Sequence, residues 1–283
     1  DTGGYCVALA ASMKYIFCGN AGETMFSTSD IGWVVGHSYI IYGPLIAGMA
    51  TIMYEGTPIR PDPGIWWQIV EKYKVNVMFS APTAIRVLKK SDNSWLHKYD
   101  LSSLKHLFLA GEPLDQPTHE WIMGELNLPV IDNYWQTETG WPILSTVRGV
   151  EDTKIKFGTP SFPVYGYDLR IFREDGTVCD ANEKGIVGIV PPLPPGCLST
   201  IWGDDERNKR EYWSHIPGMY FTGAGARKAK DGYFWILGRI DDVLNVAGHR
   251  LSTMEIESAI VSHPFVAEAA VVGRPDEVLG QAV

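Results

Sequence analysis

A hydroxyl and a carboxylate stand side by side at Thr137 and Glu138, in a polar segment that follows the apolar run 128–131. The apolar run is typical of a buried strand, and Gly140 lets the backbone of the loop after it bend. Mg²⁺ is bound in proteins by one or two carboxylates together with the phosphates of a substrate. The pair could therefore hold a phosphate oxygen and a magnesium ion. A polar surface loop with a packing tryptophan, Trp135, explains the same residues equally well.

Patterns typical of strands and helices alternate as far as residue 131. We expect strands at 50–54, 75–79, 105–110 and 130–131, and helices at 5–17 (buried), 65–73, 84–90 and 118–126. Such alternation predicts a parallel sheet covered by helices, with ligands at the carboxyl ends of its strands. The segments that could do chemistry follow such ends.

Short strands with turn signals replace this pattern after residue 150. We expect strands at 164–172, 185–190 and 233–237, a proline-rich strap at 191–195, a polar segment at 239–250, a helix from the capping pair Ser252 and Glu255 to about residue 262, and a strand at 266–272. The fold class is therefore α/β with a small antiparallel barrel and the start of a small α+β domain. We place the boundary near Asp241, with residues 1–240 in the large domain and 241–283 in the small one.

The composition excludes several classes of function. The chain of 283 residues has a net charge of −9, which argues against nonspecific binding to nucleic acid or to an anionic membrane surface. No apolar run approaches the length that spans a bilayer. The four cysteines, Cys6, Cys18, Cys179 and Cys197, lack metal-ligand spacing. We expect a reduced, cytoplasmic protein, or one of the mitochondrial matrix in a eukaryote.

Five segments resemble, in the same order, motifs of the adenylate-forming acyl-CoA synthetases. They are residues 29–39, 80–83, 110–113, 134–140 (Tyr-Trp-Gln-Thr-Glu-Thr-Gly) and 238–250. The likeness is greatest to the short-chain branch, the acetyl-CoA and especially the propionyl-CoA synthetases. It implies the adenylate-forming fold and the activation of a short carboxylate to an acyl-adenylate, then to acyl-CoA, AMP and pyrophosphate. Mg²⁺ is the implied cofactor, and ATP and CoA are the implied co-substrates.

The same resemblance implies that two parts of such an enzyme lie outside this sequence. A phosphate loop is expected before Asp1, and the lysine of the adenylation step is expected after Val283. We therefore expect an internal fragment that is inactive by itself, from a parent enzyme of the acid–thiol ligase class.

The resemblance also assigns roles to residues. Those implied to bind ATP or AMP are Gly111, Glu112, Pro113, Asp132, Asn133, Tyr134, Trp135, Gln136, Thr137, Ala224, Arg239 and Arg250. Those implied in catalysis are Thr137, Glu138 (also a magnesium ligand), Gly248 and Arg250. The acyl pocket matches Val34, Val35, Ala110 and Trp135, the CoA contacts match Val35 and Ala247, and the hinge matches Asp241. Val261, His263 and Val266 resemble a secondary metal site, although a helix terminator with a capping histidine explains them better.

Three positions bear on the choice of substrate and nucleotide. An indole at Trp135 would block long acyl chains, and Ala110 stands where acetate-specific relatives have valine, which favours propionate. The alternative for Ala110 is an alanine chosen for core packing. Ala224 stands where the family has the aspartate that holds both ribose hydroxyls. Either this sequence carries a substitution there, or its nucleotide binding is weaker.

Two other interpretations remain. A non-catalytic homologue or binding fragment is favoured by Ala224 and by the missing motifs. An adenylation domain for an amino acid would need an acidic residue to meet the ammonium group, and the predicted acyl pocket offers none. We rank that interpretation last.

Overall fold

The computed structural model describes residues 1–240, 242–246, 249–261, 263, 265–266, 269–276 and 280–283. These residues form two compact units. Unit 1 is Asp1–Tyr167 with Leu193–Thr200, and unit 2 is Asp168–Pro192 with Ile201–Val283. In the part of the chain that the structure describes, every helix is too short or too polar to cross a membrane.

A parallel sheet of five strands forms the centre of unit 1. The strands are β1 (Thr24–Ser27), β2 (Ala50–Ile52), β3 (Val77–Ser80), β4 (His106–Ala110) and β5 (Val130–Asn133). Their order is β2-β1-β3-β4-β5, and all neighbours are parallel. A two-stranded sheet of β6 (Leu144–Ser145) and β7 (Phe162–Pro163) follows.

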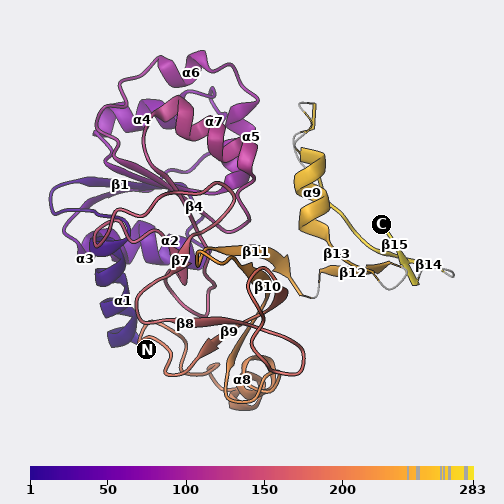
Figure 1. The fold of residues 1–283 in the computed structure, drawn as a ribbon. Coiled ribbons are helices and arrows are strands. Elements are labelled where there is room, and N and C mark those ends of the chain that lie inside the picture. Colours follow the sequence, from indigo (N-terminus) through magenta and orange to yellow (C-terminus); the bar gives the residue numbers. More distant parts are fainter. Residues whose placement is uncertain (241, 247–248, 262, 264, 267–268, 277–279) are drawn as a thin grey trace. The chain divides into compact units, whose positions relative to one another are not determined.

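Helices cover both faces of this sheet. They are α1 (Thr2–Tyr15), α2 (Val34–Gly36), the π-helix η1 (His37–Tyr42), α3 (Gly43–Ile46), α4 (Ile65–Tyr73), α5 (Pro82–Lys89), α6 (Ser94–His97) and α7 (Gln116–Leu126). Figure 1 shows α4, α5, α6 and α7 on one side of the sheet and α1 and α3 on the other. The predicted parallel sheet with covering helices is therefore confirmed.

Local sequence explains where the helices begin and end. Asp115 caps α7, because its Oδ1 accepts a hydrogen bond from the backbone N–H of Thr118 at 2.9 Å. Proline in the first turn suits both α7 and α5, since its missing N–H would have no helical partner there. For this reason α5 begins at Pro82, two residues before the predicted start. Asn127 ends α7 in a left-handed conformation.

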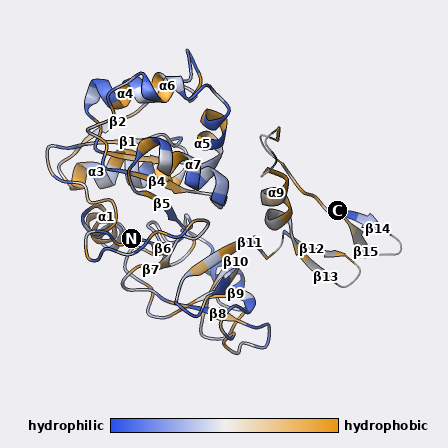
Figure 2. Ribbon diagram, turned by 45° about the horizontal axis from the view of Figure 1, so that its top comes forward, coloured by the Kyte–Doolittle hydropathy of each residue, from blue (hydrophilic) through white to orange (hydrophobic). Residues whose placement is uncertain are grey.

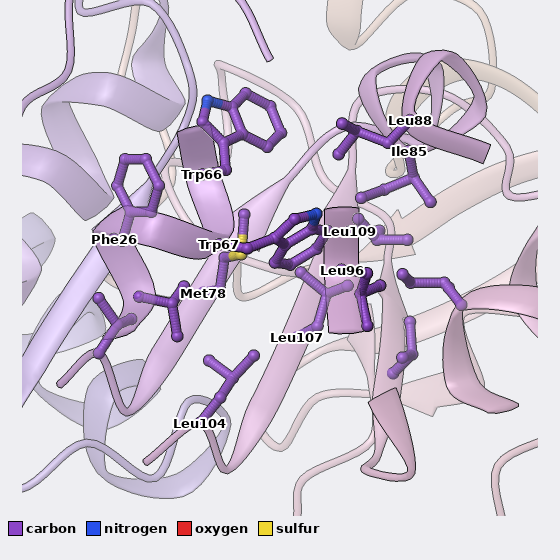
Figure 3. Packing of buried hydrophobic residues seen from close by; sticks show 14 of the residues in the cluster. Phe26, Trp66, Trp67, Met78, Ile85, Leu88, Leu96, Leu104, Leu107 and Leu109 are labelled. Carbon is purple, nitrogen blue, oxygen red and sulfur yellow. The ribbon is translucent and has the colours of Figure 1, made fainter. Parts of the chain in front are cut away.

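The core of unit 1 lies on both faces of the sheet. Figure 3 shows Trp67 of α4 packed among Met78, Leu107 and Leu109 of the strands, and all four are buried. Each such side chain contributes about 1.5–3 kcal/mol by its burial. The opposite face carries an aromatic cluster in which Phe17 contacts Tyr39, Phe79 and Phe108. The two clusters hold the strand ends in fixed positions.

Some helical predictions need correction. The helix at 5–17 was predicted to be buried, but α1 buries only Ala8, Leu9, Ser12 and Met13. Short α6 and the π-helical turn were not foreseen, because neither has a clear apolar period. In Figure 2 the ribbons of the covering helices α4, α5 and α7 carry both hydrophobic and hydrophilic residues, as one-sided packing requires.

The described residues of unit 2 form two antiparallel sheets and two helices. The elements are β8 (Asp168–Phe172), β9 (Lys184–Val190), α8 (Asp205–Tyr212), β10 (Tyr220–Lys228), β11 (Phe234–Arg239), β12 (Val243–Val246), β13 (His249–Ser252), α9 (Thr253–Val261), β14 (Arg274–Asp276) and β15 (Gly280–Ala282). The strand orders are β11-β10-β9-β8 and β13-β12-β15-β14. The antiparallel part expected after the parallel sheet is thus present, as a four-stranded sheet that includes the three longest strands.

Three predicted segments differ in the structure. Of the predicted strand at 164–172 only β8 (Asp168–Phe172) forms, because the chain turns at Gly166, whose φ is +105°. Within the polar segment 239–250, the described residues include β12 and the start of β13, which pair antiparallel. The described residues of 266–272 form no strand. Long β10 and charged α8 were not predicted.

Candidate active site

The carboxyl ends of β1, β3, β4 and β5 form one edge of the parallel sheet. The register pairs Ser27 with Phe79, Ser80 with Leu109, and Ala110 with Asn133, so the four strands end at the same level. Ligands bind at this edge in open parallel sheets. Two loops that carry predicted site residues leave the sheet here, one after β4 and one after β5.

The loop after β4 begins with an open backbone at Gly111. This residue has φ +101°, and a Cβ added to it would meet no atom within 4 Å. A flat ring could therefore approach the backbone here, and any other residue type would be strained. Pro113 is exposed, whereas Glu112 is half-buried and its Oε1 accepts from the backbone N–H of Thr83 at 3.0 Å. The Glu112 carboxylate also pairs with Arg86, which sequence analysis did not single out.

The end of β5 carries two buried polar side chains. Among the described residues, Oδ1 of Asp132 and both amide atoms of Asn133 have no hydrogen-bond partner. Burial raises the pKa of the Asp132 carboxyl well above its usual value, which favours the neutral acid. Buried polar atoms in folded proteins are normally paired, so unsatisfied ones next to an open loop suggest a place where a ligand supplies the partner.

A tight turn after β5 presents Thr137 and Glu138. Thr139 closes the turn, since its Oγ1 accepts from the backbone N–H of Gln136 (3.2 Å) and donates to the backbone oxygen of Gln136 (3.0 Å). Gly140 completes it with φ +74°. Thr137 is exposed and Glu138 half-buried. A hydroxyl and one carboxylate fit Mg²⁺ when substrate phosphates supply further ligands.

The turn is fixed from two other segments of unit 1. Ser38 of η1 donates to the backbone oxygen of Gly140 at 3.0 Å, and its hydroxyl also lies 2.5 Å from that of Tyr5. The backbone N–H of Leu198 donates to the backbone oxygen of Glu138 at 2.7 Å. π-helical turns occur often at functional sites, and here one connects a predicted pocket wall with the predicted phosphate-binding turn.

Trp135, one of the predicted acyl-pocket residues, has its indole packed beside two other aromatic rings. Its centroid lies 5.5 Å from that of Tyr39 in η1 and 6.5 Å from that of Phe79 in β3. Val34 and Val35 form α2, which runs directly into η1. Ala110 is buried at the end of β4 and shares a face of the sheet with Phe108. The ring of Phe17 contacts both Phe108 and Phe79. The predicted pocket residues thus come from α2, the end of β4 and the segment after β5.

Three predicted nucleotide-binding residues lie in unit 2, which is described separately, and the structure describes the surroundings of two of them, Ala224 and Arg239. Ala224 sits in an irregular part of β10, where the register with β9 shifts between Phe221 and Gly225. It is 5% exposed and pairs in register with Arg239 of β11, which is exposed. Bulges of this kind re-aim a side chain and are common beside active sites.

The remaining predicted residues lie mostly outside what the structure describes. Asp241, Ala247 and Gly248 are outside the described residues, and of Arg250 only the backbone in β13 is described. The segment proposed as a secondary metal site ends a helix. Val261 is the last residue of α9, His263 donates its backbone N–H to Ile260, and its Nδ1 accepts from the backbone of Phe265 at 3.3 Å. Val266 in turn donates its backbone N–H to His263. These contacts agree with the helix-terminator interpretation.

The fold resembles that of a solved ligase. The crystal structure of the anthranilate CoA ligase AuaEII in complex with anthranoyl-AMP matches 98% of this chain with a TM-score of 0.84. The identity is 23%, and the match covers 51% of that chain. At this identity the likeness concerns the fold, which is the adenylate-forming fold predicted from the motifs.

Sequence comparison shows the family. The propionate–CoA ligase of Escherichia coli K12 is 59% identical over 283 residues, which is 99% of this chain and 45% of that protein. The acetyl-coenzyme A synthetase of Chlorobaculum tepidum is 49% identical over 285 residues, covering 43% of its length. The chain thus spans less than half the length of these curated relatives. Family models described as AMP-binding enzyme and AMP-binding enzyme C-terminal domain match residues 2–190 and 255–283. The chain therefore belongs to the AMP-binding enzyme family.

Proposed function

We propose that the protein activates a short-chain carboxylate with ATP and then transfers the acyl group to CoA. The carboxylate attacks the α-phosphate and displaces pyrophosphate, and the CoA thiol then displaces AMP from the acyl-adenylate. One observation carries this proposal: three features lie together at one edge of the sheet. They are the open backbone at Gly111 after β4, the unsatisfied polar atoms of Asp132 and Asn133 at the end of β5, and the turn with Thr137 and Glu138 after β5. The names of the two relatives support it.

In this proposal the chain binds and aligns the reactants. The backbone at Gly111 approaches the adenine ring, and Thr137 donates its hydroxyl to a phosphate oxygen. Glu138 would hold Mg²⁺, which neutralises the charge of the phosphates when bound. The nucleophile belongs to the substrate, so the contribution of the protein is alignment and electrostatic stabilisation. Arg239 and Arg250 are proposed to contact the ribose and the phosphates.

We further propose that the acid is short, with propionate preferred over acetate. The support is the packing of Trp135 against Tyr39 and Phe79, which fixes a large ring where the acyl chain would extend. Ala110 is smaller than valine by two methyl groups, which leaves room for the extra methylene of propionate. We also propose a domain boundary near Asp241, about which the small domain rotates between the two half-reactions, bringing Ala247 and Gly248 to the CoA chain.

The test uses the full-length protein with ATP, CoA and a series of acids from acetate to hexanoate. We expect acyl-CoA, AMP and pyrophosphate as products, with the highest kcat/KM for propionate. Glu138→Gln should lower kcat by roughly a hundredfold or more, because it removes the proposed metal ligand. The matched control is Glu120→Gln on the exposed surface of α7, which should leave the rate unchanged. Formation of ADP, or no product with any acid, would contradict the proposal.

A second candidate is a homologue that binds nucleotide weakly and does no chemistry. The observation in its favour is Ala224, a buried residue without any side-chain acceptor for the ribose hydroxyls. Calorimetric titration with ATP separates the two candidates when it is run beside the activity assay. Weak binding together with no product from the full-length protein would support the second candidate over the first.

A further inference from the structure

Arg86 joins the start of α5 to the loop after β4 at the carboxyl edge of the sheet. It lies in α5, the helix after β3, and its side chain is only 14% exposed. Its Nη2 donates to Oγ1 of Thr83 at 3.0 Å and to the carboxylate of Glu112. Its Nη1 donates to Oδ2 of Asp115 at 3.2 Å. One guanidinium therefore bridges the start of α5 and the loop that follows β4.

The two carboxylates mark the beginning and the end of that loop. Glu112 follows Gly111 directly, and its Oε1 also accepts from the backbone N–H of Thr83. Asp115 caps α7 through Thr118, and its side chain is 8% exposed. Arg86 thus binds both Glu112, which follows Gly111, and Asp115, which caps α7. The carboxylate of Glu112 is occupied by these protein groups.

This arrangement makes the guanidinium difficult to replace. Arginine offers several N–H groups in a fixed planar fork, which lets it serve a hydroxyl and two carboxylates together. Without it, two carboxylates near the protein interior would lose their common counter-charge, and the loop would move to let water reach them. The residue that would move with Glu112 is Gly111, whose backbone conformation keeps the edge of the sheet open.

We propose that Arg86 is a positioning residue for the base of the nucleotide. It holds Glu112 and Asp115, and through them keeps the backbone at Gly111 where a flat adenine ring can lie against it. Glu112 then anchors the loop and does not contact the nucleotide. This inference rests on the proposed function, because the ligand of the edge is ATP only if that function is correct.

The test compares Arg86→Gln, Arg86→Lys and Glu112→Gln in the full-length protein. The measured quantities are KM for ATP, KM for propionate, and the ratio of kcat/KM for ATP and GTP. We expect KM for ATP to rise roughly 10- to 100-fold in Arg86→Gln, since a displaced loop misplaces the base. The ratio of kcat/KM for ATP to kcat/KM for GTP should fall at the same time. KM for propionate should stay within about twofold of the wild type, because the acid binds away from this loop.

Lys89→Met is the matched control. Lys89 lies one turn further along α5 and also reaches the region of α7, donating its Nζ to the backbone oxygen of Pro117 at 3.0 Å. The substitution Lys89→Met removes a cation from the same helix without changing a contact of Glu112 or Asp115. Both KM values and the preference for ATP over GTP should therefore remain those of the wild type. The double variant of Arg86→Gln with Glu112→Gln should be no worse than Arg86→Gln alone, because both act on the same anchor.

The outcomes separate the inference from the function. An active wild type with unchanged KM for ATP and unchanged base preference in Arg86→Gln would overturn the inference alone. Equal rises in KM for ATP and KM for propionate in Arg86→Gln would also overturn the inference, since they indicate a general structural role. A full-length wild type without ATP-dependent activity would overturn the proposed function, and the role of Arg86 with it. If Arg86→Gln fails to fold, Arg86→Lys and Glu112→Gln carry the same comparison, checked by thermal unfolding.

Discussion

We expect the size of one indole to control how far an acyl chain can extend in the proposed pocket. Trp135 packs against Tyr39 and Phe79, so its replacement opens space beside two rigid rings. We expect Trp135→Gly to raise kcat/KM for acids from butyrate to hexanoate. The wild type should separate acetate from propionate only modestly, because one methylene is worth roughly 1–3 kcal/mol.

The control for this change is Trp202→Gly, which removes an indole that is 98% exposed in unit 2. It should leave the order of substrates unchanged. Measured kcat/KM values over the series of acids decide the matter. If Trp135→Gly brought no gain for longer acids, the indole would not be the floor of the pocket.

A single carboxylate is expected to strengthen nucleotide binding at Ala224. Ala224 pairs in register with Arg239. An aspartate at this position would therefore lie beside a cation as well as beside the proposed ribose site. Hydrogen bonds to a charged group contribute about 1.5–3 kcal/mol, which corresponds to a tightening of roughly tenfold or more. We expect Ala224→Asp in the full-length protein to lower the Kd of ATP accordingly, as measured by calorimetric titration.

Ala224→Asn separates the effect of charge from that of shape, because asparagine has nearly the same volume as aspartate and carries no charge. It should recover only part of the gain. Equal Kd values for the wild type and Ala224→Asp, within about twofold, would mean that the ribose is held elsewhere.

A histidine at the opposite end of the sheet should make stability depend on pH. Burial, with the positive charges of Arg148 and Lys105, lowers the pKa of His106 from 6.5 to about 4. Between these two values the unfolded chain binds a proton that the folded chain does not, so stability is full above pH 6.5 and falls as the pH drops toward 4. With allowance for the partial exposure of the ring, we expect a loss of about 1–2 kcal/mol.

Denaturant unfolding of the wild type and of His106→Gln, at neutral pH and at about pH 4.5, measures this contribution. The variant should lose less stability on acidification than the wild type. Parallel losses in the two proteins would show that His106 already takes up its proton in the folded state.

At the scale of elements, the π-helical turn η1 connects two parts of the proposed site. Ser38 bonds the backbone of Gly140, and Tyr39 packs on Trp135. We expect Ser38→Ala to cost about 0.5–1.5 kcal/mol of stability through the lost hydrogen bond. Because the turn with Thr137 and Glu138 would loosen, kcat should fall roughly tenfold while the KM values change little.

Ser12→Ala is the control for Ser38→Ala. Ser12 is also buried and accepts a hydrogen bond from Tyr39 at 2.9 Å, but it does not touch the turn. Its stability cost should be similar and its kcat close to that of the wild type. A similar fall in kcat for both serine variants would place the effect in the packing of η1 and not in the hydrogen bond to Gly140.

The elements also show what the sequence could predict. Strands β3, β4 and β5 are short apolar runs before polar loops, so their positions and the edge with Thr137 and Glu138 followed from pattern and motif. Strand β10 was missed because Gly223 and Gly225 interrupt its alternation where the register shifts. The bond from Arg86 to Glu112 joins residues 26 positions apart, and only the packing of α5 beside the loop after β4 brings them together.

At the scale of the whole molecule, the two units should respond separately to core damage. Leu107 is buried in the sheet of unit 1, and Val187 is buried in β9 of unit 2. Large-to-small changes of this kind cost roughly 1–5 kcal/mol, depending on how far the site can collapse. We expect Leu107→Ala to raise amide hydrogen exchange in β3 and β4 while β10 stays protected, and Val187→Ala to do the reverse.

Exchange measured peptide by peptide on the full-length protein tests this expectation. Each variant serves as the control for the other. Equal deprotection of β4 and β10 in both variants would mean that the units unfold as one.

The path of the chain between the units has a consequence for synthesis on the ribosome. The chain leaves unit 1 after Tyr167, returns for Leu193–Thr200, and leaves again, so unit 1 lacks one segment until residue 200 has emerged. The hairpin of β8 and β9 has been made by then, but β10, the other neighbour of β9, begins only at Tyr220. Until β10 has been made, the backbone groups along one edge of the apolar strand β9 have no partner strand. Unpaired strand edges of this kind are sites of aggregation. A translational pause between residues 190 and 220 would therefore endanger the nascent protein more than a pause after β10 is complete.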